Sequence, residues 1–476
     1  MKVEKSKFLE NARPLLQQLI GDLRKEYPYV SVLGNDCRSR SFRMARSGMA
    51  VSAGGLYTER GFVLRVMDEK GFGEYSFNHL STKALAGIEE RIRKNLIPLL
   101  DCLPETIDFM KREVPEDLPR ELEGAGDYEL HPDELGEKEI LERLQAVRRS
   151  GMETDERVID CAARLEYQEI HKLFLSANRS LEQDLLWTDG SIVAMARRGQ
   201  EIKTQYQPFS LLGGAELLDQ MKDAAPEVAR VAVELLESEP LVPGTYECVC
   251  TPDVTGMIVH EAFGHGVEMD MFVKDRALAA DYIGKYVASP LVTMHDGAAV
   301  ARQTGSYFFD DEGVEACDTV IIEKGILKRG ISDSLSASSL GTVPTGNGRR
   351  QDYSRKAYTR MTNTWFEGGT DSVEDMIASV KDGLLLESPS SGMEDPKNWG
   401  IQAMVSFGRE IKDGKLTGRI FSPIVLSGFV PDLLKSISMM SPNAELSGSG
   451  MCGKGYKEWV KVSCGGPYIK AMIRLG

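Results

Sequence analysis

Glycine is distributed unevenly along this chain of 476 residues, and this limits the fold more than any other feature of the sequence. Of the 46 glycines, 29 lie after residue 240, where they interrupt many short apolar runs. Glycine weakens regular elements and supplies the tight turns between short strands. Asp413-Gly414, directly after the strand pattern of residues 407–412, is a strong hairpin signal. The second half is therefore expected to be a mostly antiparallel β domain.

The first half alternates helical and extended patterns instead. A period of two in residues 61–67 predicts a strand. Residues 113–133 are rich in Pro, Glu, Asp and Gly and predict a surface loop. Helical spacing of apolar residues predicts four helices, at residues 8–23, 81–98, 134–150 and 215–238.

A proline-rich interruption separates these two patterns. Glu239-Pro240 and Val242-Pro243-Gly244 follow the last predicted helix of the first half. We therefore place a boundary there, with an N-terminal α+β domain over residues 1–240 and a C-terminal domain over residues 241–476. The expected fold class is α+β: a mixed α/β first domain, then a Gly-rich, mostly antiparallel β domain.

Charge and hydropathy exclude two classes of partner. Lys and Arg number 57 against 72 Asp and Glu, which gives a net charge of −15. Such a chain has no excess of cations to neutralise phosphates, so we expect no nucleic-acid partner. No stretch approaches the roughly 18 apolar residues of a membrane span, and the N-terminus lacks the apolar core of a signal peptide. The expected location is the cytoplasm, with no membrane partner.

The chemistry-bearing residues concentrate in one predicted helix. Thr251-Pro252 is a paired helix start signal, and the apolar helix that follows carries His260, Glu261 and His265. Histidines five positions apart are separated by about 140° on a regular helix, too far to share one metal ion. A π-bulge would reduce the separation to about 40°, and a helix break before His265 is the other route to a shared site. Without either, one histidine lies in the core and the other on the surface. Outside this helix, His295-Asp296-Gly297 predicts a turn with a solvated imidazole.

Four ordered sequence blocks give this motif a wider context. HEAFGHGVE at residues 260–268 is followed by FFDDEG at 308–313, RMTN at 360–363 and GMCGK at 450–454. In this order, the blocks resemble those of the TldD/PmbA family of zinc metallopeptidases. The resemblance covers roughly residues 240–476. The chain is similar to the TldD branch in particular, because the PmbA branch lacks the HExxxH motif.

The resemblance implies a ligand set for one zinc ion per chain. His260 and His265 would bind the metal together with Cys452, and Glu261 would be the general base. Two imidazoles and one thiolate make a sensible zinc site with a fourth position left open. From the residues alone, a free thiol is the preferred interpretation of Cys452, and Cys464 is an alternative ligand. Glu268 and Asp270 either orient a ligand histidine or form a solvated acidic face.

The resemblance also implies an activity and a partner. We expect a zinc-dependent peptidase acting on unfolded or short peptides, as a homodimer or as a heterodimer with a PmbA-like subunit. The alternative is a non-catalytic or regulatory subunit of such a complex with a structural metal site. Cys464 or Glu268 as a fourth protein ligand would favour this alternative, whereas a base such as Glu261 has no use in a structural site.

Overall fold

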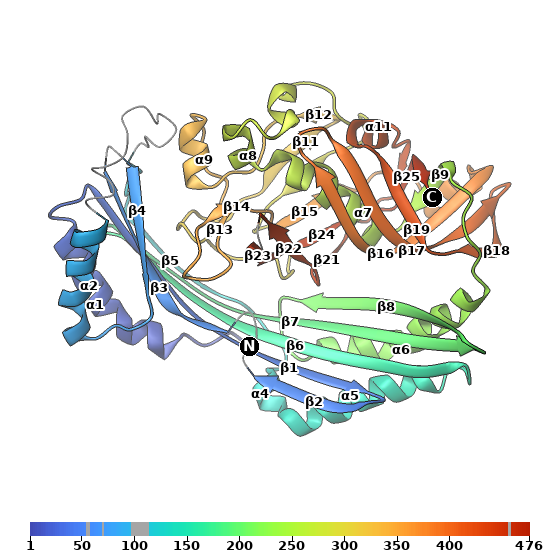
Figure 1. The fold of residues 1–476 in the computed structure, drawn as a ribbon, viewed down its shortest axis with the longest axis horizontal. Coiled ribbons are helices and arrows are strands. Elements are labelled where there is room, and N and C mark those ends of the chain that lie inside the picture. The colour runs from blue at the N-terminus through green and yellow to red at the C-terminus, as the bar shows by residue number, and fades with distance from the viewer. Residues whose placement is uncertain (54–57, 69–70, 97–113, 456–457) are drawn as a thin grey trace.

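A long, curved β-sheet from the first half lies against several smaller sheets from the second half (Figure 1). The structure is a computed structural model, and it describes residues 1–53, 58–68, 71–96, 114–455 and 458–476. The expected α+β class is confirmed. No helix among these residues is both long and apolar enough to cross a membrane.

Eight strands form the long sheet. Their order is β4-β3-β1-β6-β7-β5, with β2 paired to β1 and β8 paired to β7. Their bounds are β1 Tyr29–Ala45, β2 Gly48–Ala53, β3 Glu59–Asp68, β4 Gly71–Phe77, β5 Arg120–Ala125, β6 Val158–Leu175, β7 Arg179–Arg198 and β8 Glu201–Leu211. The surface loop expected at 113–133 is wrong over β5, which runs parallel to β7 as an edge strand. Backbone pairing with β7 there outweighs a composition that disfavours strands.

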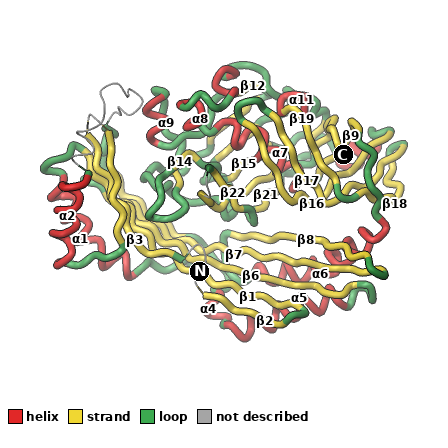
Figure 2. Tube along the Cα trace, viewed as in Figure 1, coloured by secondary structure: helices red, strands yellow, loops and turns green. Residues whose placement is uncertain are grey.

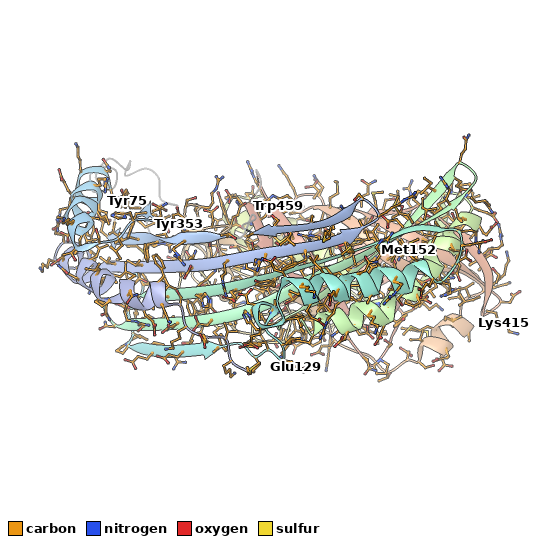
Figure 3. All side chains as sticks on the ribbon, turned by 90° about the horizontal axis from the view of Figure 1, so that it is seen from below. Tyr75, Glu129, Met152, Tyr353, Lys415 and Trp459 are labelled. Carbon is orange, nitrogen blue, oxygen red and sulfur yellow. The ribbon has the colours of Figure 1, made fainter. Side chains whose placement is uncertain are left out.

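Helices cover the convex face of this sheet (Figures 1 and 2). Leucines and isoleucines of α1 and α2 pack on β1 and β3, and apolar residues of α5 and α6 pack on β6 and β7. Figure 3 views the sheet from below, with the helix that ends at Met152 lying along the strands. The helices are α1 Lys7–Leu23, α2 Thr82–Asn95, α4 Pro132–Leu135, α5 Glu137–Met152 and α6 Leu217–Glu234.

These helices confirm the four that the sequence predicts. The hydroxyl of Ser81 accepts a hydrogen bond from the Ala84 backbone N–H, which caps α2. The predicted end of that helix at Pro98 lies outside the described residues. A short 3-10 turn at Leu235–Glu237 follows α6, and the second set of sheets starts with β9 at Gly244. A domain division between residues 240 and 241 is therefore our proposal.

The second half is built on two main sheets, and most of their pairs are antiparallel, as predicted. One has the order β16-β9-β25-β19-β17-β18, with β20 on β25, and an extra β16–β17 pairing closes five strands into a ring. The other has the order β12-β11-β10-β15-β24-β21, and two small pairs, β13–β14 and β22–β23, complete the set. In the predicted hairpin between β17 and β18, Asp413 and Gly414 both have positive φ.

The strands of the second half are β9 Gly244–Cys250, β10 Met294–Asp296, β11 Thr319–Glu323, β12 Ile326–Leu327, β13 Gly348–Arg349, β14 Tyr358–Thr359, β15 Asn363–Phe366, β16 Asp382–Asp395, β17 Gly400–Lys412, β18 Lys415–Phe421, β19 Ile424–Phe429, β20 Met439–Met440, β21 Glu445–Ser447, β22 Met451–Lys454, β23 Glu458–Lys461, β24 Ser463–Gly466 and β25 Ile469–Leu475. The helices are α7 Pro252–Val259, α8 Met269–Val273, α9 Ser334–Ser339, α10 Val373–Ala378 and α11 Val430–Lys435, with a 3-10 turn at Leu278–Tyr282.

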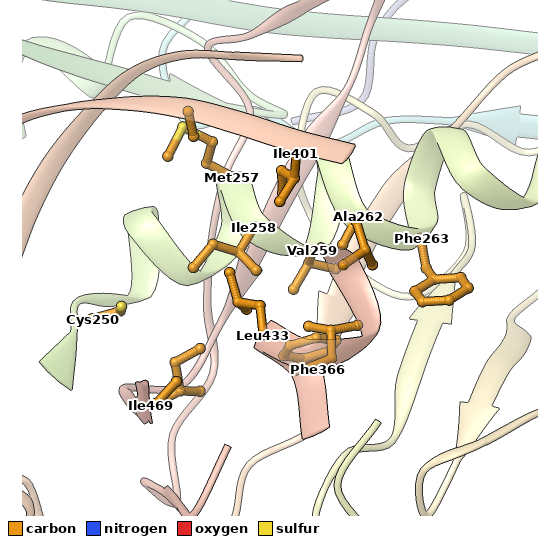
Figure 4. Close-up of a cluster of buried hydrophobic side chains, with 14 of the residues drawn as sticks. Cys250, Met257, Ile258, Val259, Ala262, Phe263, Phe366, Ile401, Leu433 and Ile469 are labelled. Carbon is orange, nitrogen blue, oxygen red and sulfur yellow. The ribbon is translucent and has the colours of Figure 1, made fainter. Parts of the chain in front are cut away.

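Helix α7 runs through the core of the second half (Figure 4). Val254, Ile258 and Val259 are fully buried, and they pack with apolar residues of both main sheets. Burial of so many apolar groups fixes the position of the helix, at roughly 1.5–3 kcal/mol for each large side chain. The residues that continue this helix are therefore held rigidly.

Ion pairs join the two halves of the chain across the concave face of the long sheet. Lys172 on β6 pairs with Asp311, and Lys461 on β23 pairs with Asp189 on β7. Arg350 pairs with Glu74 on β4, and the residues just before it, 346–349, are largely buried as well. The second half therefore lies against the sheet of the first half, with polar groups of both at the contact.

Candidate metal centre

The helix that carries the HExxxH motif contains one π-helical turn. Helix α7 ends at Val259, and residues His260–Gly264 form the π turn. A 3-10 turn follows at His265–Val267. The π turn absorbs one extra residue, so His265 returns to the side of His260. The two imidazole centroids lie 5.1 Å apart. Of the two alternatives that the sequence leaves open, it is therefore the π-bulge that brings the histidines together.

Gly264 is required where the π turn packs against the core. A Cβ atom at this position would lie 2.1 Å from the sulfur of Met361, which is fully buried. Gly264→Ala is therefore expected to lower the free energy of unfolding by about 1–3 kcal/mol through overpacking. In a Met361→Ala background the same change should cost less, because the clash is gone. Urea denaturation of the four proteins in this double-mutant cycle measures the difference; equal costs in both backgrounds would contradict it.

Cys452 reaches the two histidines from a distant part of the chain. It lies on β22, and its sulfur is 3.3 Å from Nε2 of His265. One ligand atom from each of His260, His265 and Cys452 lies within 4.8 Å of the others. Cys464 on β24 lines the same cleft but is not a member of this group. Burial raises the pKa of the Cys464 thiol to about 12, which keeps it neutral and makes it a poorer ligand.

Electrostatic interactions favour the thiolate form of Cys452. Burial opposes ionisation of Cys452, but the charges of His265 and His260 outweigh burial and hold its pKa well below the usual value. Burial likewise disfavours the charged form of His265, yet Cys452 and then Glu268 raise its pKa well above the usual value. Without a metal ion, both shifts favour a thiolate at Cys452 beside a charged His265.

Glu268 supports His265 from behind. Its Oε2 atom lies 3.2 Å from Nδ1 of His265 and 3.1 Å from the ammonium group of Lys454. Burial raises the pKa of Glu268, but the charges of Lys454 and His265 lower it to about 2. Asp270 is buried too, and it pairs with Lys454 at 2.6 Å. Of the two roles left open by the sequence, the geometry matches orientation of a histidine by Glu268, not a solvated face.

Glu261 faces a cleft of about 1100 Å³ that also contains the three candidate ligands. A Cβ atom added to Gly392 on β16 would lie 2.9 Å from Oε1 of Glu261, so the glycine makes room for the carboxylate. Tyr206 and Pro208 on β8 line the opposite part of the cleft. The cleft is thus shared by the two halves of the chain, and the largely buried Glu261 forms part of its wall.

Glu394 also lines the cleft, although no pattern in the sequence points to it. Both of its carboxylate oxygens are buried and lack a hydrogen-bond partner among the described residues. Burial, opposed by His265 and supported by Glu261, raises the pKa of Glu394 to about 9. It lies on β16, far along the chain from the motif helix, and only the fold brings it to the site.

The donor set fits a zinc ion. Two imidazoles and a thiolate are soft and borderline ligands that favour zinc over magnesium or calcium. Three protein ligands leave one position for a substrate or a water molecule, which is the arrangement of catalytic zinc sites. Nδ1 of His260 is also buried without a hydrogen-bond partner among the described residues. Because buried polar atoms normally have a partner, this is consistent with an imidazole that binds a metal ion.

A second cluster of possible ligands lies in the long sheet, and it does not fit a cation. His131, Asp133 and Glu169 bring ligand atoms within 4.8 Å of one another. However, Arg38 donates to both oxygens of Glu169 and pairs with Asp133 at 3.0 Å. A guanidinium already occupies the place of a cation, so this cluster is an ion-pair network. Its histidine, His131, shows no partner pattern in the sequence because Glu169 and Arg38 come from distant strands.

One expectation about a histidine outside the motif is wrong. The sequence His295-Asp296-Gly297 reads as a turn with a solvated imidazole. Instead, His295 lies on β10, is 7% exposed and hydrogen-bonds to Asp318 and Glu367, each at 2.9 Å. Its ring also stacks on Trp365. These contacts satisfy the ring within the sheet and keep it apart from the candidate metal centre.

Comparisons with known proteins agree with this architecture. Residues 243–472 match the family model described as the PmbA/TldA metallopeptidase C-terminal domain. A metalloprotease TldD homolog of Buchnera aphidicola is 31% identical over 345 residues, 70% of each chain. A zinc metalloprotease TldD homolog of Saccharolobus solfataricus is 31% identical over 309 residues, 64% of this chain and 68% of its own. The structure of TldE from Thermococcus kodakarensis has the same fold, with a TM-score of 0.72 at 18% identity over 97% of this chain and all of its own.

The second half therefore matches a PmbA/TldA metallopeptidase C-terminal domain over residues 243–472. The chain as a whole belongs to the PmbA/TldD family. The family membership confirms the resemblance that was inferred from the four sequence blocks.

Proposed function

We propose that this chain is a zinc-dependent peptidase that hydrolyses unfolded or short peptides. The observation that carries the proposal is the convergence of His260, His265 and Cys452 in a cleft that Glu261 also lines. His260, His265 and Cys452 would hold one zinc ion, and Glu261 would act as the general base. The relatives named metalloproteases support the same activity.

The residues of the chain divide the chemical work. A bound zinc ion would supply Lewis acidity, which polarises a peptide carbonyl and makes a water molecule more acidic. Glu261 would accept the proton of the attacking water and pass it to the amine that leaves. Glu268 would keep His265 in the tautomer and orientation that binding requires.

The strand beside Glu261 favours extended peptides as substrates. Residues 388–394 of β16 line the cleft. β16 pairs with β9 only over Gly383–Leu386, and beyond that point its partner among the described residues is β17 alone. One edge of β16 is thus open along the cleft, where a peptide could pair as an added strand. A folded protein cannot offer such a strand without local unfolding.

We propose a dimer as the working form, either a homodimer or a heterodimer with a PmbA-like subunit. The cleft between the halves would then open into an internal chamber that admits unfolded chains. The name TldE of the structural neighbour supports a partner of that family. We propose the cytoplasm as the compartment, because a thiolate ligand needs reducing conditions.

The alternative is a regulatory or non-catalytic subunit with a structural metal site. Such a site is closed by four protein ligands, whereas the cluster among the described residues contains three. Glu268 pairs with Lys454 and contacts the Nδ1 side of His265, away from the Nε2 atom that faces Cys452. Cys464 lies outside the cluster. The geometry therefore favours the peptidase.

Metal removal tests the proposed function. Treatment with a chelator is expected to abolish hydrolysis of an unstructured, fluorescence-quenched peptide, and added zinc should restore it. The assay is run on this chain alone and together with a PmbA-like subunit. Hydrolysis that survives complete metal removal, or a zinc-loaded protein that is inactive in both forms, would overturn the proposal.

A further inference from the structure

We infer that Arg360 is a positioning residue that sets the relative positions of two candidate metal ligands, Cys452 and His265. The inference rests on the proposed metal centre. Arg360 lies between β14 and β15, and its side chain is 1% exposed, one of the largest fully buried side chains of the chain. Burying an unpaired guanidinium is very unfavourable. The partners of Arg360 therefore indicate which groups it positions.

The partners of Arg360 hold the hairpin that carries Cys452. One terminal nitrogen donates to the backbone carbonyl of Cys452 at 2.7 Å, and the other donates to the carbonyl of Glu458 at 2.6 Å. Cys452 lies on β22 and Glu458 on β23, the two strands of this hairpin. One planar group thus fixes both strands, and β22–β23 is a two-stranded pair that joins neither main sheet.

The same guanidinium also faces the carboxylate behind His265. Nε of Arg360 is 3.6 Å from Oε1 of Glu268, and the other oxygen of Glu268 is at 3.2 Å from Nδ1 of His265. Arg360 therefore links the carbonyl of one ligand residue to the carboxylate that orients another. The ligands come from the motif helix and from a hairpin nearly two hundred residues later, so a rigid link between them preorganises the site.

Lysine cannot replace arginine in this role. Arg360 binds two carbonyls and faces a carboxylate from one rigid plane, whereas an ammonium group is a single point on a flexible stem. Lys454 already occupies the other side of Glu268. Arg360→Lys keeps the charge but releases at least one strand of the hairpin.

Cobalt binding to the full-length, metal-free protein tests the inference. Arg360→Lys is expected to weaken Co²⁺ binding by about 10–100-fold, the usual effect of removing a partner of a metal ligand. The thiolate-to-cobalt absorption band should also weaken or shift. Arg65→Lys is the matched control, since Arg65 is also buried but lies on β3 of the first half, where it pairs with Glu74 and Glu312. It should leave the cobalt affinity and the spectrum unchanged.

Thermal melting of the metal-free proteins separates positioning from stability. A purely structural role predicts lower melting temperatures for both variants and a wild-type cobalt spectrum, and this result would overturn the inference. If Arg360→Lys does not fold, Arg360→Gln, which keeps one donor, is judged by the same spectrum. A wild type that binds no cobalt would instead overturn the metal centre itself. If the wild type binds cobalt and the folded Arg360 variant binds it with equal affinity, only the role of Arg360 would be overturned.

Discussion

Replacing Glu261 with glutamine is expected to lower kcat/KM for peptide hydrolysis by about 10²–10⁴-fold, the contribution of a general base. The zinc content should stay at the wild-type level, because Glu261 is not a member of the ligand cluster. The amide has nearly the shape of the carboxylate, so the cleft beside Gly392 is preserved. Peptide turnover and elemental analysis on the same samples measure both quantities.

A second carboxylate seven residues later provides the contrasting control. Glu268→Gln should weaken zinc binding by about 10–100-fold, because its carboxylate holds His265. At saturating zinc its activity should recover, whereas that of Glu261→Gln should not. If Glu261→Gln keeps wild-type activity, or loses activity only in proportion to its zinc, Glu261 is not the base.

Replacing Cys452 with serine is expected to remove both the zinc and the activity. A neutral hydroxyl is a far weaker ligand for zinc than a thiolate, so the content should fall from about one zinc per chain to near zero after dialysis. The thiolate is already favoured in the metal-free site by His265 and His260. Elemental analysis before and after dialysis measures the loss.

Cys464→Ser is the matched control for this substitution. Both thiols line the same cleft, but only Cys452 belongs to the ligand cluster. The Cys464 variant should retain zinc and hydrolysis. Loss of zinc in Cys464→Ser with retention in Cys452→Ser would exchange the roles of the two cysteines. Loss in both would indicate a structural site closed by two thiolates.

Local signals in the sequence predict the elements of the fold well. The helix start at Thr251-Pro252, the cap at Ser81 and the Asp413-Gly414 turn each depend on neighbours in the chain, and the structure has all three elements. Strand β5 is different, since pairing with a distant strand decides its conformation. The solvent exposure expected for His295 is wrong for the same reason, because Asp318 and Glu367 reach the ring from other segments.

The candidate site follows the same division. The motif helix shows its chemistry in the sequence, and helical geometry alone requires either a bulge or a break near His265. Cys452 stands out only through the family resemblance, since a lone cysteine carries no spacing signal. The place of Glu394 in the cleft and the contacts of Arg360 are visible only in three dimensions, because both residues meet the site through tertiary packing.

The most direct test of the zinc centre is anomalous diffraction at the zinc edge from crystals of the zinc-loaded protein. We expect one peak per chain, at about 2.0–2.1 Å from a nitrogen of His260 and of His265 and about 2.3 Å from the sulfur of Cys452, with a fourth position free of protein ligands. A peak coordinated by Cys464 or Glu268, or no peak at this cluster in zinc-saturated crystals, would contradict the proposed zinc centre.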